Sequence, residues 1–239
     1  MSGSCCLTKK NSITAKTAIL VFARSAQQDA KHKRFRNAVS VFETLNAQIL
    51  KTVKQTELEY FVYSEDEQRG STFGERFTNA IQDIYNLGFE QIISVGNDTP
   101  HLTKDHFAKA EEKLKTCPLV LGPSQDGGFY LMGLKKSHFN PVSFLKLPWQ
   151  TSTLTASIVR LVQAKKIEAL FLETLQDLDS AEDIQPLLNS TQKLNFQLRT
   201  QLKSAIKIHK PIEAVERVFF SQNYSGVFFN KGSPARLSA

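Results

Sequence analysis

The chain has 239 residues, 41% of them hydrophobic, enough to bury a sizeable core in one main domain with an appendage. Its longest apolar run, 17–23, has the length of a strand and falls short of the ~20 residues that a membrane span needs. The net charge is +7. The segment 191–239 holds eight Lys or Arg against two acidic residues, so the first 190 residues are nearly neutral.

The first sixteen residues lack the apolar centre of a signal peptide, so we expect a flexible tail and a cytoplasmic protein. The cysteines, Cys5, Cys6 and Cys117, cannot all pair and support neither a disulfide framework nor a zinc site. The basic residues of 191–239 are spaced and carry no aromatic-interleaved nucleic-acid motif. We favour a solvated helix face over a polyanion-binding face, and we expect no specific nucleic-acid partner.

Apolar runs of strand length alternate with segments of helical spacing. The expected strands are 17–23, 59–63, 91–95, 119–121, 128–134 and 167–172. The expected helices are 38–53, one that ends at Asn86 before a left-handed cap at Gly88, one that Thr103 caps and Pro118 ends, 153–165, and a short helix to Leu188 with Ser180 and Asp183 as its capping box. We expect loops over 24–37, 64–76 and 141–149. This alternation predicts an α/β fold with a three-layer, mostly parallel sheet.

Beyond Asn189 the pattern changes. Leucines at helical spacing predict one more helix, and 216–232 (ERVFFSQNYSGVFFNKG) resembles a hairpin. Its four phenylalanines must pack on something, either the main domain or a second copy of the chain in a homodimer. We therefore predict a tail over 1–16, a main domain over 17–190 and a basic, Phe-rich appendage over 191–239.

Two aspartates lie in turns that follow expected strands. Asp98 is flanked by Gly96, which permits close approach of a ligand, and by Pro100, which fixes the turn. Asp126 lies in a stretch with three glycines and a proline. Taken alone, each is also typical of an ordinary turn. Because ligands bind at the carboxyl ends of strands in open α/β sheets, the two could share one anionic ligand or metal.

A third acidic set consists of Asp177, Asp179 and Asp183. Asp177 and Asp179 alternate, so they face the same side of an extended segment, whereas Asp183 is placed to cap a helix. Carboxylates that reach one crevice from distant parts of a chain suit an oxygen-ligated Mg²⁺ or Mn²⁺. Such a metal bridges nucleotide phosphates and neutralises a leaving diphosphate.

A basic segment follows the first strand directly and contains Lys31, His32, Lys33, Arg34 and Arg36. It can hold phosphates electrostatically, but it has no glycines to form a backbone cradle. A solvated surface loop is at least as good an interpretation.

Four motifs, VGNDTPHL, LGPSQDGGFYLMGL, LPWQTSTL and DLDSAEDI, resemble in order and spacing those of the bacterial DUF2064 proteins. This family is also known as the rSAM/selenodomain-associated transferase 1 or arsenosugar-biosynthesis glycosyltransferase-like family. The resemblance covers 18–188. It implies a nucleotide-diphospho-sugar transferase fold of the glycosyltransferase A type, a Rossmann-like sheet that binds a nucleotide-sugar with a divalent metal.

The resemblance also implies roles for individual residues. Asp98, with Gly96 beside it, would bind the metal and the diphosphate, and Asp179 would approach the metal from the opposite side. Asp126 is expected to contact the acceptor or to act as the catalytic base. The remaining expected positions are Gly127 and Gly128 on the sugar or acceptor side, Trp149 and Thr151 on the pocket wall, and Arg24, Arg34 and Arg76 at the nucleotide phosphates.

Two segments depart from the family pattern. The family opens with FAKxPxPGxxKTRL, whereas this chain has FARSAQQDAKHKRF. The prolines are absent, Lys31 or His32 replaces the lysine, and Asp29 stands at the glycine position, where a carboxylate near phosphates is unfavourable unless it turns away. The family's QGxDLGER is RGSTFGER here, so Thr72 replaces an aspartate.

These features favour a metal-dependent glycosyltransferase that uses a nucleotide-diphospho-sugar donor and a small-molecule acceptor. One alternative is nucleotidyl transfer to a phosphorylated small molecule, which the same fold supports but which needs a phosphate-cradling first loop. The other is a catalytically degenerate relative that binds a nucleotide or a protein. The altered first loop favours degeneracy, whereas the preserved aspartates and glycines favour catalysis.

Overall fold

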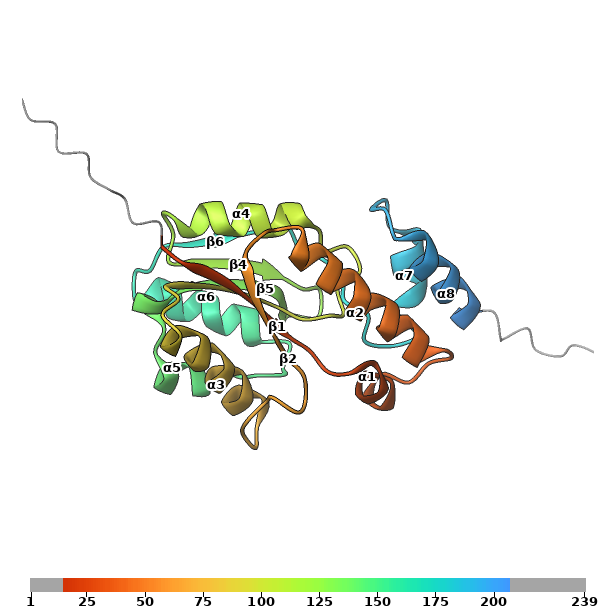
Figure 1. Ribbon diagram of the computed structural model, residues 1–239, viewed down its shortest axis with the longest axis horizontal. Coiled ribbons are helices and arrows are strands. Elements are labelled where there is room, and N and C mark those ends of the chain that lie inside the picture. Colours follow the sequence, from red (N-terminus) through yellow and green to blue (C-terminus); the bar gives the residue numbers. More distant parts are fainter. Residues whose placement is uncertain (1–14, 207–239) are drawn as a thin grey trace, which may run out of the picture. The chain divides into compact units, whose positions relative to one another are not determined.

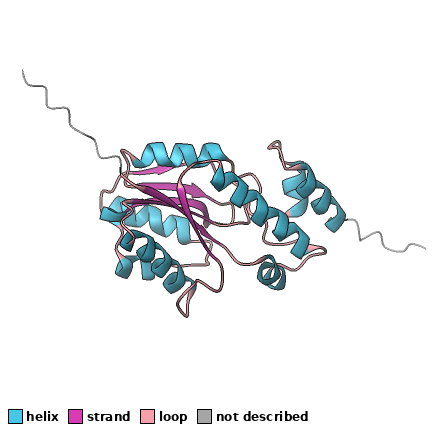
Figure 2. Cartoon of the chain, in the orientation of Figure 1, coloured by secondary structure: helices cyan, strands magenta, loops and turns pink. Residues whose placement is uncertain are grey.

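The computed structural model describes residues 15–206, in which strands and helices alternate (Figures 1 and 2). The strands are β1 (Thr17–Phe22), β2 (Glu59–Tyr63), β3 (Gln91–Val95), β4 (Leu119–Pro123), β5 (Phe129–Lys135) and β6 (Ala169–Phe171). The helices are α1 (Ala26–His32), α2 (Ala38–Lys54), α3 (Phe73–Asn86), α4 (Lys104–Leu114), α5 (Pro141–Leu145), α6 (Leu154–Ala164), α7 (Ile184–Asn189) and α8 (Phe196–Ile206), with a 3₁₀ turn, η1 (Lys136–His138). Within this range, no helix is long and apolar enough to cross a membrane.

The strands form one sheet in the order β2-β1-β3-β5-β4-β6. Strand β1 pairs in parallel with both β2 and β3, and β4 pairs in parallel with β6. Strand β5 is antiparallel to its neighbours β3 and β4. The predicted α/β fold with a mostly parallel sheet is confirmed. Because β5 runs the other way, its amino-terminal end lies at the same edge as the carboxyl ends of β1 and β3.

Helices cover both faces of the sheet (Figure 1). On one face, α3, α5 and α6 pack on the sheet around Phe77, Ile81 and Ile158. On the other face, α2 and α4 pack around Ile49 and Phe107. The central strands β1 and β3 are buried along their whole length because they have a helical layer on each side. This is the three-layer architecture expected from the sequence.

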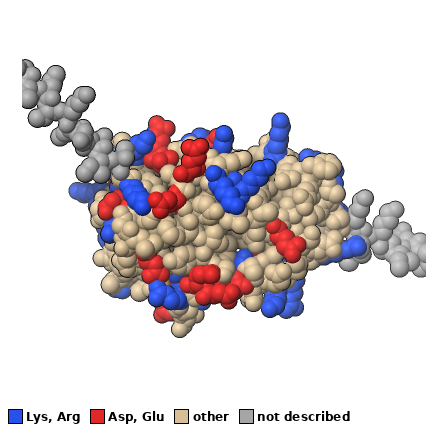
Figure 3. Space-filling model, viewed as in Figure 1, with Lys and Arg blue, Asp and Glu red and all other residues tan. Residues whose placement is uncertain are grey.

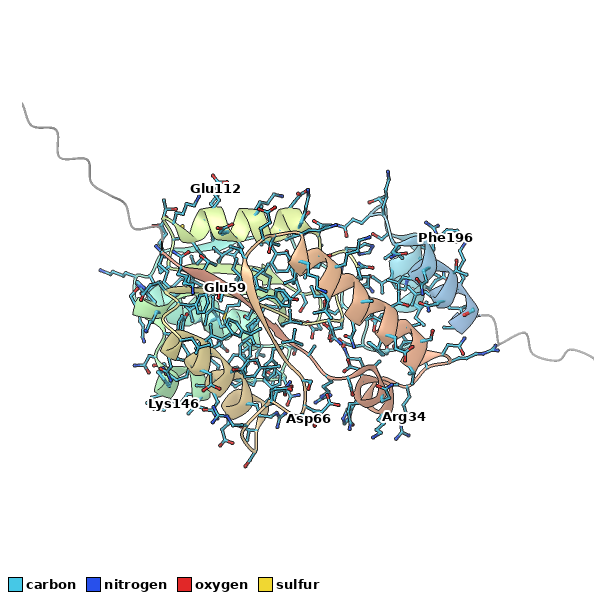
Figure 4. All side chains as sticks on the ribbon, viewed as in Figure 1. Arg34, Glu59, Asp66, Glu112, Lys146 and Phe196 are labelled. Atoms are coloured by element: carbon cyan, nitrogen blue, oxygen red, sulfur yellow. The ribbon has the colours of Figure 1, made fainter. Side chains whose placement is uncertain are left out.

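A third apolar cluster joins α1, α2, α7 and α8. Leu198 and Leu202 of α8 are completely buried in it, whereas Phe196 on the same helix is 84% exposed. Figure 4 shows Phe196 on the outer side of α8. The boundary predicted at residue 190 precedes α8. The expected tail over 1–16 falls almost entirely outside the described residues, and the expected hairpin over 216–232 and the dimer through it lie wholly outside them.

Several expected loops contain helix. The segment 24–37 holds α1, which Ser25 caps by accepting a hydrogen bond from Gln28 N. Its anchors are tertiary: the Ser25 amide donates to the Glu65 carboxylate at 2.7 Å. The segment 141–149 holds α5, with a proline in its first turn, which suits that position because the amide there has no helical partner.

Helix boundaries differ from expectation at two further places. Helix α3 begins at Phe73, inside the expected loop 64–76, because Thr72 and Glu75 form a capping box. Thr72, which departs from the family pattern, therefore has a structural role. Helix α7 begins only at Ile184, although the Ser180 amide does donate to the Asp183 carboxylate at 2.7 Å, one half of the expected capping box. Gly88 follows α3 with a φ of +94°, as the predicted left-handed cap requires.

Candidate active site

A cavity of about 420 Å³ opens at the carboxyl ends of β1 and β3. Between these two strands the order of the sheet reverses, since the chain leaves β1 toward β2 on one side and returns to β3 on the other. Such a switch point is where open α/β sheets leave a crevice for ligands. The chain following β1, the turn after β3, the β4–β5 turn and the segment 177–179 all contribute to its lining.

Most of the site residues expected from the sequence line this cavity. They are Arg24, Arg76, Gly96, Asp98, Asp126, Gly128, Trp149, Thr151 and Asp179. Two expected residues do not line it. Arg34 is exposed beyond the end of α1 (Figure 4), where its Nε donates to Lys31 O at 3.1 Å. Gly127 instead lies against Ser152 and has a φ of +91°.

Lys33 is the residue that joins the acidic groups of the cavity. Its Nζ lies 2.6 Å from Asp98 Oδ2 and 2.7 Å from Asp179 Oδ1, and it also donates to Leu178 O at 3.3 Å. Burial lowers the pKa of Lys33, but the two carboxylates outweigh burial and raise the pKa well above its usual value. Burial raises the pKa of Asp98, yet Lys33 more than offsets this and lowers the pKa overall. The ion pairs therefore keep Lys33 and Asp98 charged, whereas burial outweighs Lys33 at Asp179 and raises the pKa of that carboxyl.

Asp29 explains how Lys33 reaches that position. The two residues are four apart along the end of α1, so their side chains leave the same face of the helix. Asp29 Oδ2 accepts a hydrogen bond from Asn97 Nδ2 at 2.8 Å, while Lys33 meets the next residue, Asp98. Asp29 is thus buried and turned toward the β3 turn, where it fixes α1.

Asp177 is the second carboxylate of the segment 177–179, and its pKa is shifted in the same direction as that of Asp179. Its carboxylate accepts a hydrogen bond from Thr99 Oγ1. Burial, and then the negative charge of Asp98, raise the pKa of Asp177 well above its usual range. The surroundings therefore lower the pKa of Asp98 and raise the pKa of Asp177. Opposite shifts of neighbouring carboxyl groups are common in sites that move protons.

Asp126 forms the turn between β4 and β5. Its Oδ1 accepts a hydrogen bond from Gly128 N at 2.9 Å and another from Ser124 Oγ. The residue is exposed and also lines the cavity. The turn-forming interpretation and the binding interpretation of Asp126 are therefore compatible, because one carboxylate oxygen holds the turn.

Aromatic side chains form the opposite wall of the cavity. Trp149 lies over Gly74, where a Cβ would be only 2.5 Å from its Cδ1, and its Nε1 donates to Phe144 O at 2.8 Å. The ring centroid of Trp149 is 5.3 Å from that of Phe77 and 6.2 Å from that of Phe129. Trp149 therefore packs against the core on one side and forms part of the cavity wall on the other. Core packing and a stacking surface are the two roles expected of a lone tryptophan, and Trp149 is placed for both.

The cavity lining mixes both signs of charge. Its cationic side chains are Arg24, Lys33 and Arg76, and its acidic ones are Asp29, Asp98, Asp126, Asp177 and Asp179. Arg76 NH1 donates to Ser71 O at 3.3 Å. Acidic and basic side chains are also interspersed over the molecular face in Figure 3.

The carboxylates of the cavity are the residues from which a metal site would be built. Among residues 15–206, no group of three or more His, Cys, Asp or Glu side chains is placed to hold a metal ion. The two carboxylates expected to hold one, Asp98 and Asp179, both contact the ammonium group of Lys33 instead. In this arrangement the residues do not fit a divalent metal.

The central place of Lys33 was not predicted from the sequence, nor were the contributions of Asn97 and Thr99. In the sequence, Lys33 is one of several basic residues in a polar segment expected to be a loop. A signal was present, since Asp29 and Lys33 have helical spacing, but nothing local indicates that both side chains are buried.

A solved structure that is similar to this chain shares its fold. A protein of Desulfovibrio desulfuricans G20 provisionally assigned as a nucleotide-diphospho-sugar transferase superimposes with a TM-score of 0.70 at 20% identity, covering 80% of this chain and 95% of that one. Two mycobacterial structures are more distant. The homologue of Rv0371c from Mycobacterium sp. strain JC1 has 10% identity over 79% of this chain and 98% of that one, with a TM-score of 0.44. Rv0371c of Mycobacterium tuberculosis H37Rv in complex with manganese has 12% identity over 74% and 100%, with a TM-score of 0.43.

No curated protein sequence matches the chain. The Desulfovibrio desulfuricans protein has the fold of this chain, as expected from the motifs. The family model described as "Uncharacterized protein conserved in bacteria (DUF2064)" matches residues 19–151, more than half of the sequence. The chain belongs to the DUF2064 family.

Proposed function

We propose that this protein is a glycosyltransferase that binds a nucleotide-diphospho-sugar in the cavity between β1 and β3 and transfers the sugar to a small-molecule acceptor. One observation carries the proposal: cationic side chains, carboxylates and an aromatic wall from distant segments converge at the switch point of the sheet. The DUF2064 membership and the transferase fold of the Desulfovibrio desulfuricans protein agree with it.

The diphosphate is expected to lie against Arg24 and Arg76. Both line the cavity, and guanidinium groups match the geometry of phosphate oxygens. Gly96 also lines the cavity, and a Cβ there would lie 3.0 Å from Asp98 Oδ1, so the glycine keeps the space beside this carboxylate open. The sugar or the base is expected on the aromatic side, along Trp149 and Phe129.

Asp126 is our candidate for contact with the acceptor and for the catalytic base. It is exposed at the cavity, and only Oδ1 is used by the turn. In the transfer step, the acceptor hydroxyl gives its proton to Asp126 and its oxygen bonds to the anomeric carbon. The bond from that carbon to the diphosphate oxygen breaks, and its electron pair leaves with the nucleoside diphosphate. Gly128 and Thr151 lie on the acceptor side in this proposal.

Mg²⁺ or Mn²⁺ would neutralise the leaving diphosphate if it were bound by Asp98 and Asp179. Because Lys33 already contacts both carboxylates, we assign no step to a metal. Arg24 and Arg76 supply positive charge at the cavity from the chain itself, while the charge of Lys33 is paired with Asp98 and Asp179.

Nucleotidyl transfer is the weaker candidate. An NTP brings more negative charge than a nucleotide-sugar, and the cavity lining contains five carboxylates. The segment after β1 also offers α1, a helix of seven residues, in place of a glycine-rich phosphate cradle. We also propose that the protein acts in the cytoplasm, as expected from the sequence.

A thermal-shift panel tests the function. UDP-, GDP-, ADP- and dTDP-sugars and the four NTPs are added to the wild type and to Arg24→Gln and Arg76→Gln, each with and without Mn²⁺. A ligand at ~100 times its dissociation constant adds about 2.7 kcal/mol, a shift of several degrees. We expect one nucleotide-sugar to stabilise the wild type and both variants to bind it at least 10-fold more weakly.

Arg34→Gln is the matched control, because Arg34 is an exposed arginine that does not line the cavity. It should bind as the wild type does. Release of the nucleoside diphosphate in the presence of an acceptor would identify glycosyl transfer, and release of pyrophosphate from an NTP would identify nucleotidyl transfer. If no nucleotide shifts the wild type, the transferase proposal is wrong and the degenerate, binding-only relative takes its place.

A further inference from the structure

The ammonium group of Lys33 is surrounded by oxygen atoms. Its three N–H bonds have three acceptors, namely Asp98 Oδ2 at 2.6 Å, Asp179 Oδ1 at 2.7 Å and Leu178 O at 3.3 Å. The side chain is only 15% exposed. Two of these ligands are the carboxylates that a nucleotide-binding metal would use, and they come from the turn after β3 and from the segment before α7.

We infer that Lys33 is the resident cation of the Asp98–Asp179 carboxylate pair and that it excludes a divalent metal from this position. A metal bound by both carboxylates would need to lie at about 2.0–2.2 Å from their oxygens. That place is within contact distance of Nζ, so two cations would share one site. Either the ammonium or the metal can occupy it, and the ammonium is part of the chain, so its binding there is intramolecular.

Lys33 is held in place by its helix as well as by the carboxylates. One turn earlier on α1, Asp29 is buried and hydrogen-bonded to Asn97. At the start of α1, the Ser25 amide donates to Glu65. To release the site, Lys33 would have to break two short ion pairs while α1 stays fixed, and the two carboxylates would then face each other without a counter-charge.

The inference has a consequence for ligand binding, which rests on the proposed function. A nucleotide diphosphate that enters the cavity meets a carboxylate pair whose negative charge Lys33 already offsets in part, with Arg24 and Arg76 available to its phosphates. Binding of the nucleotide-sugar should therefore change less than 2-fold when EDTA replaces Mn²⁺.

Titration of Mn²⁺ alone, with no nucleotide, tests the site itself. Free Mn²⁺ is followed by electron paramagnetic resonance with the wild type, Lys33→Met and the double variant Lys33→Met/Asp98→Asn. We expect Lys33→Met to gain one Mn²⁺ site that binds at least 10-fold more tightly than any site in the wild type, and the double variant to lose it. Lys31→Met, an exposed lysine on the same helix, is the matched control and should behave as the wild type does.

Tight binding of Mn²⁺ to the wild type, lost in Asp98→Asn, would overturn the inference, as would a folded Lys33→Met that gains no site. If Lys33→Met does not fold, the wild type decides: absence of a site that depends on Asp98 supports the inference, and its presence refutes it. Because no nucleotide is added, these results stand apart from success or failure of the proposed function.

Discussion

Gly127 is the residue whose backbone most restricts substitution in the β4–β5 turn. Its φ is +91°, and a Cβ there would lie 2.0 Å from Ser152 O. We expect Gly127→Ala to lower the free energy of unfolding by about 3 kcal/mol, through backbone strain and a clash with backbone that cannot move freely. Denaturant unfolding measures this. Gly88→Ala is the control, since Gly88 has a φ of +94° but an open surrounding, and it should cost only about 1 kcal/mol. Equal losses in the two variants would refute the clash.

His101 is a buried side chain with a predictable pH response. It is 5% exposed, and burial lowers its pKa, opposed by a hydrogen bond with the backbone of Gln192. The folded protein therefore binds the proton of His101 more weakly than the unfolded chain does, so stability is lost as the pH falls below about 6.5. The slope from this one proton cannot exceed about 1.4 kcal/mol per pH unit.

Unfolding of His101→Gln between pH 7 and pH 5 checks this response. The difference in unfolding free energy between the wild type and the variant should shrink or reverse toward pH 5, because the variant has no proton to bind at this position. His32→Gln, at an exposed position, should follow the wild type. A constant difference for His101→Gln would contradict the burial effect.

At the scale of elements, one buried anchor of α1 is the hydrogen bond between Asp29 and Asn97. Asn97 Nδ2 donates to Asp29 Oδ2 at 2.8 Å and to Asn46 Oδ1 at 2.6 Å. Asn97→Ala would leave the buried Asp29 carboxylate without this donor, so we expect a loss of about 1–3 kcal/mol in unfolding free energy. Gln27→Ala, on the exposed side of α1, should change it by less than about 0.5 kcal/mol. Faster amide hydrogen exchange in α1 of Asn97→Ala alone would show that the helix has been released; unchanged exchange would contradict this role.

Strands β1 and β3 could be predicted from the sequence because they are short apolar runs buried on both faces. Helix α1 could not be predicted, because its segment is polar and has no apolar residues repeating at helical spacing. Its anchors lie 40 residues away at Glu65 and 68 residues away at Asn97. Contacts of that range leave no local signal. The reversed direction of β5 was likewise not predicted.

At the scale of the whole molecule, α8 belongs to the packed core beside α2. Leu202 is completely buried there, whereas Phe196 is 84% exposed. We expect Leu202→Ala to lower the free energy of unfolding by about 2–5 kcal/mol, the cost of a cavity. Phe196→Ala, a larger truncation on the same helix, should change it by less than about 0.5 kcal/mol. Urea unfolding of both variants distinguishes burial from side-chain size; a small loss for Leu202→Ala would mean that α8 does not stabilise the domain.

Much of the candidate site could be predicted, because Asp98, Asp126 and Asp179 lie in turns whose glycines and spacing are visible in the sequence and do line one cavity. The ammonium group of Lys33 between Asp98 and Asp179 could not be predicted. The identity of Lys33 as the partner depends on the tertiary position of α1, which sequence spacing does not encode. For that reason the sequence suggested a metal where the structure has an ion pair.

A crystal structure of the wild type, grown in EDTA with the nucleotide-sugar that gives the largest thermal shift, tests the central claim most directly. We expect the diphosphate against Arg24 and Arg76 at the switch point, with Lys33 still between Asp98 and Asp179. A nucleotide bound elsewhere on the chain would contradict the proposed site. A nucleotide that enters the cavity only when Mn²⁺ lies between Asp98 and Asp179, with Lys33 displaced, would contradict the assignment of Lys33 as the resident cation.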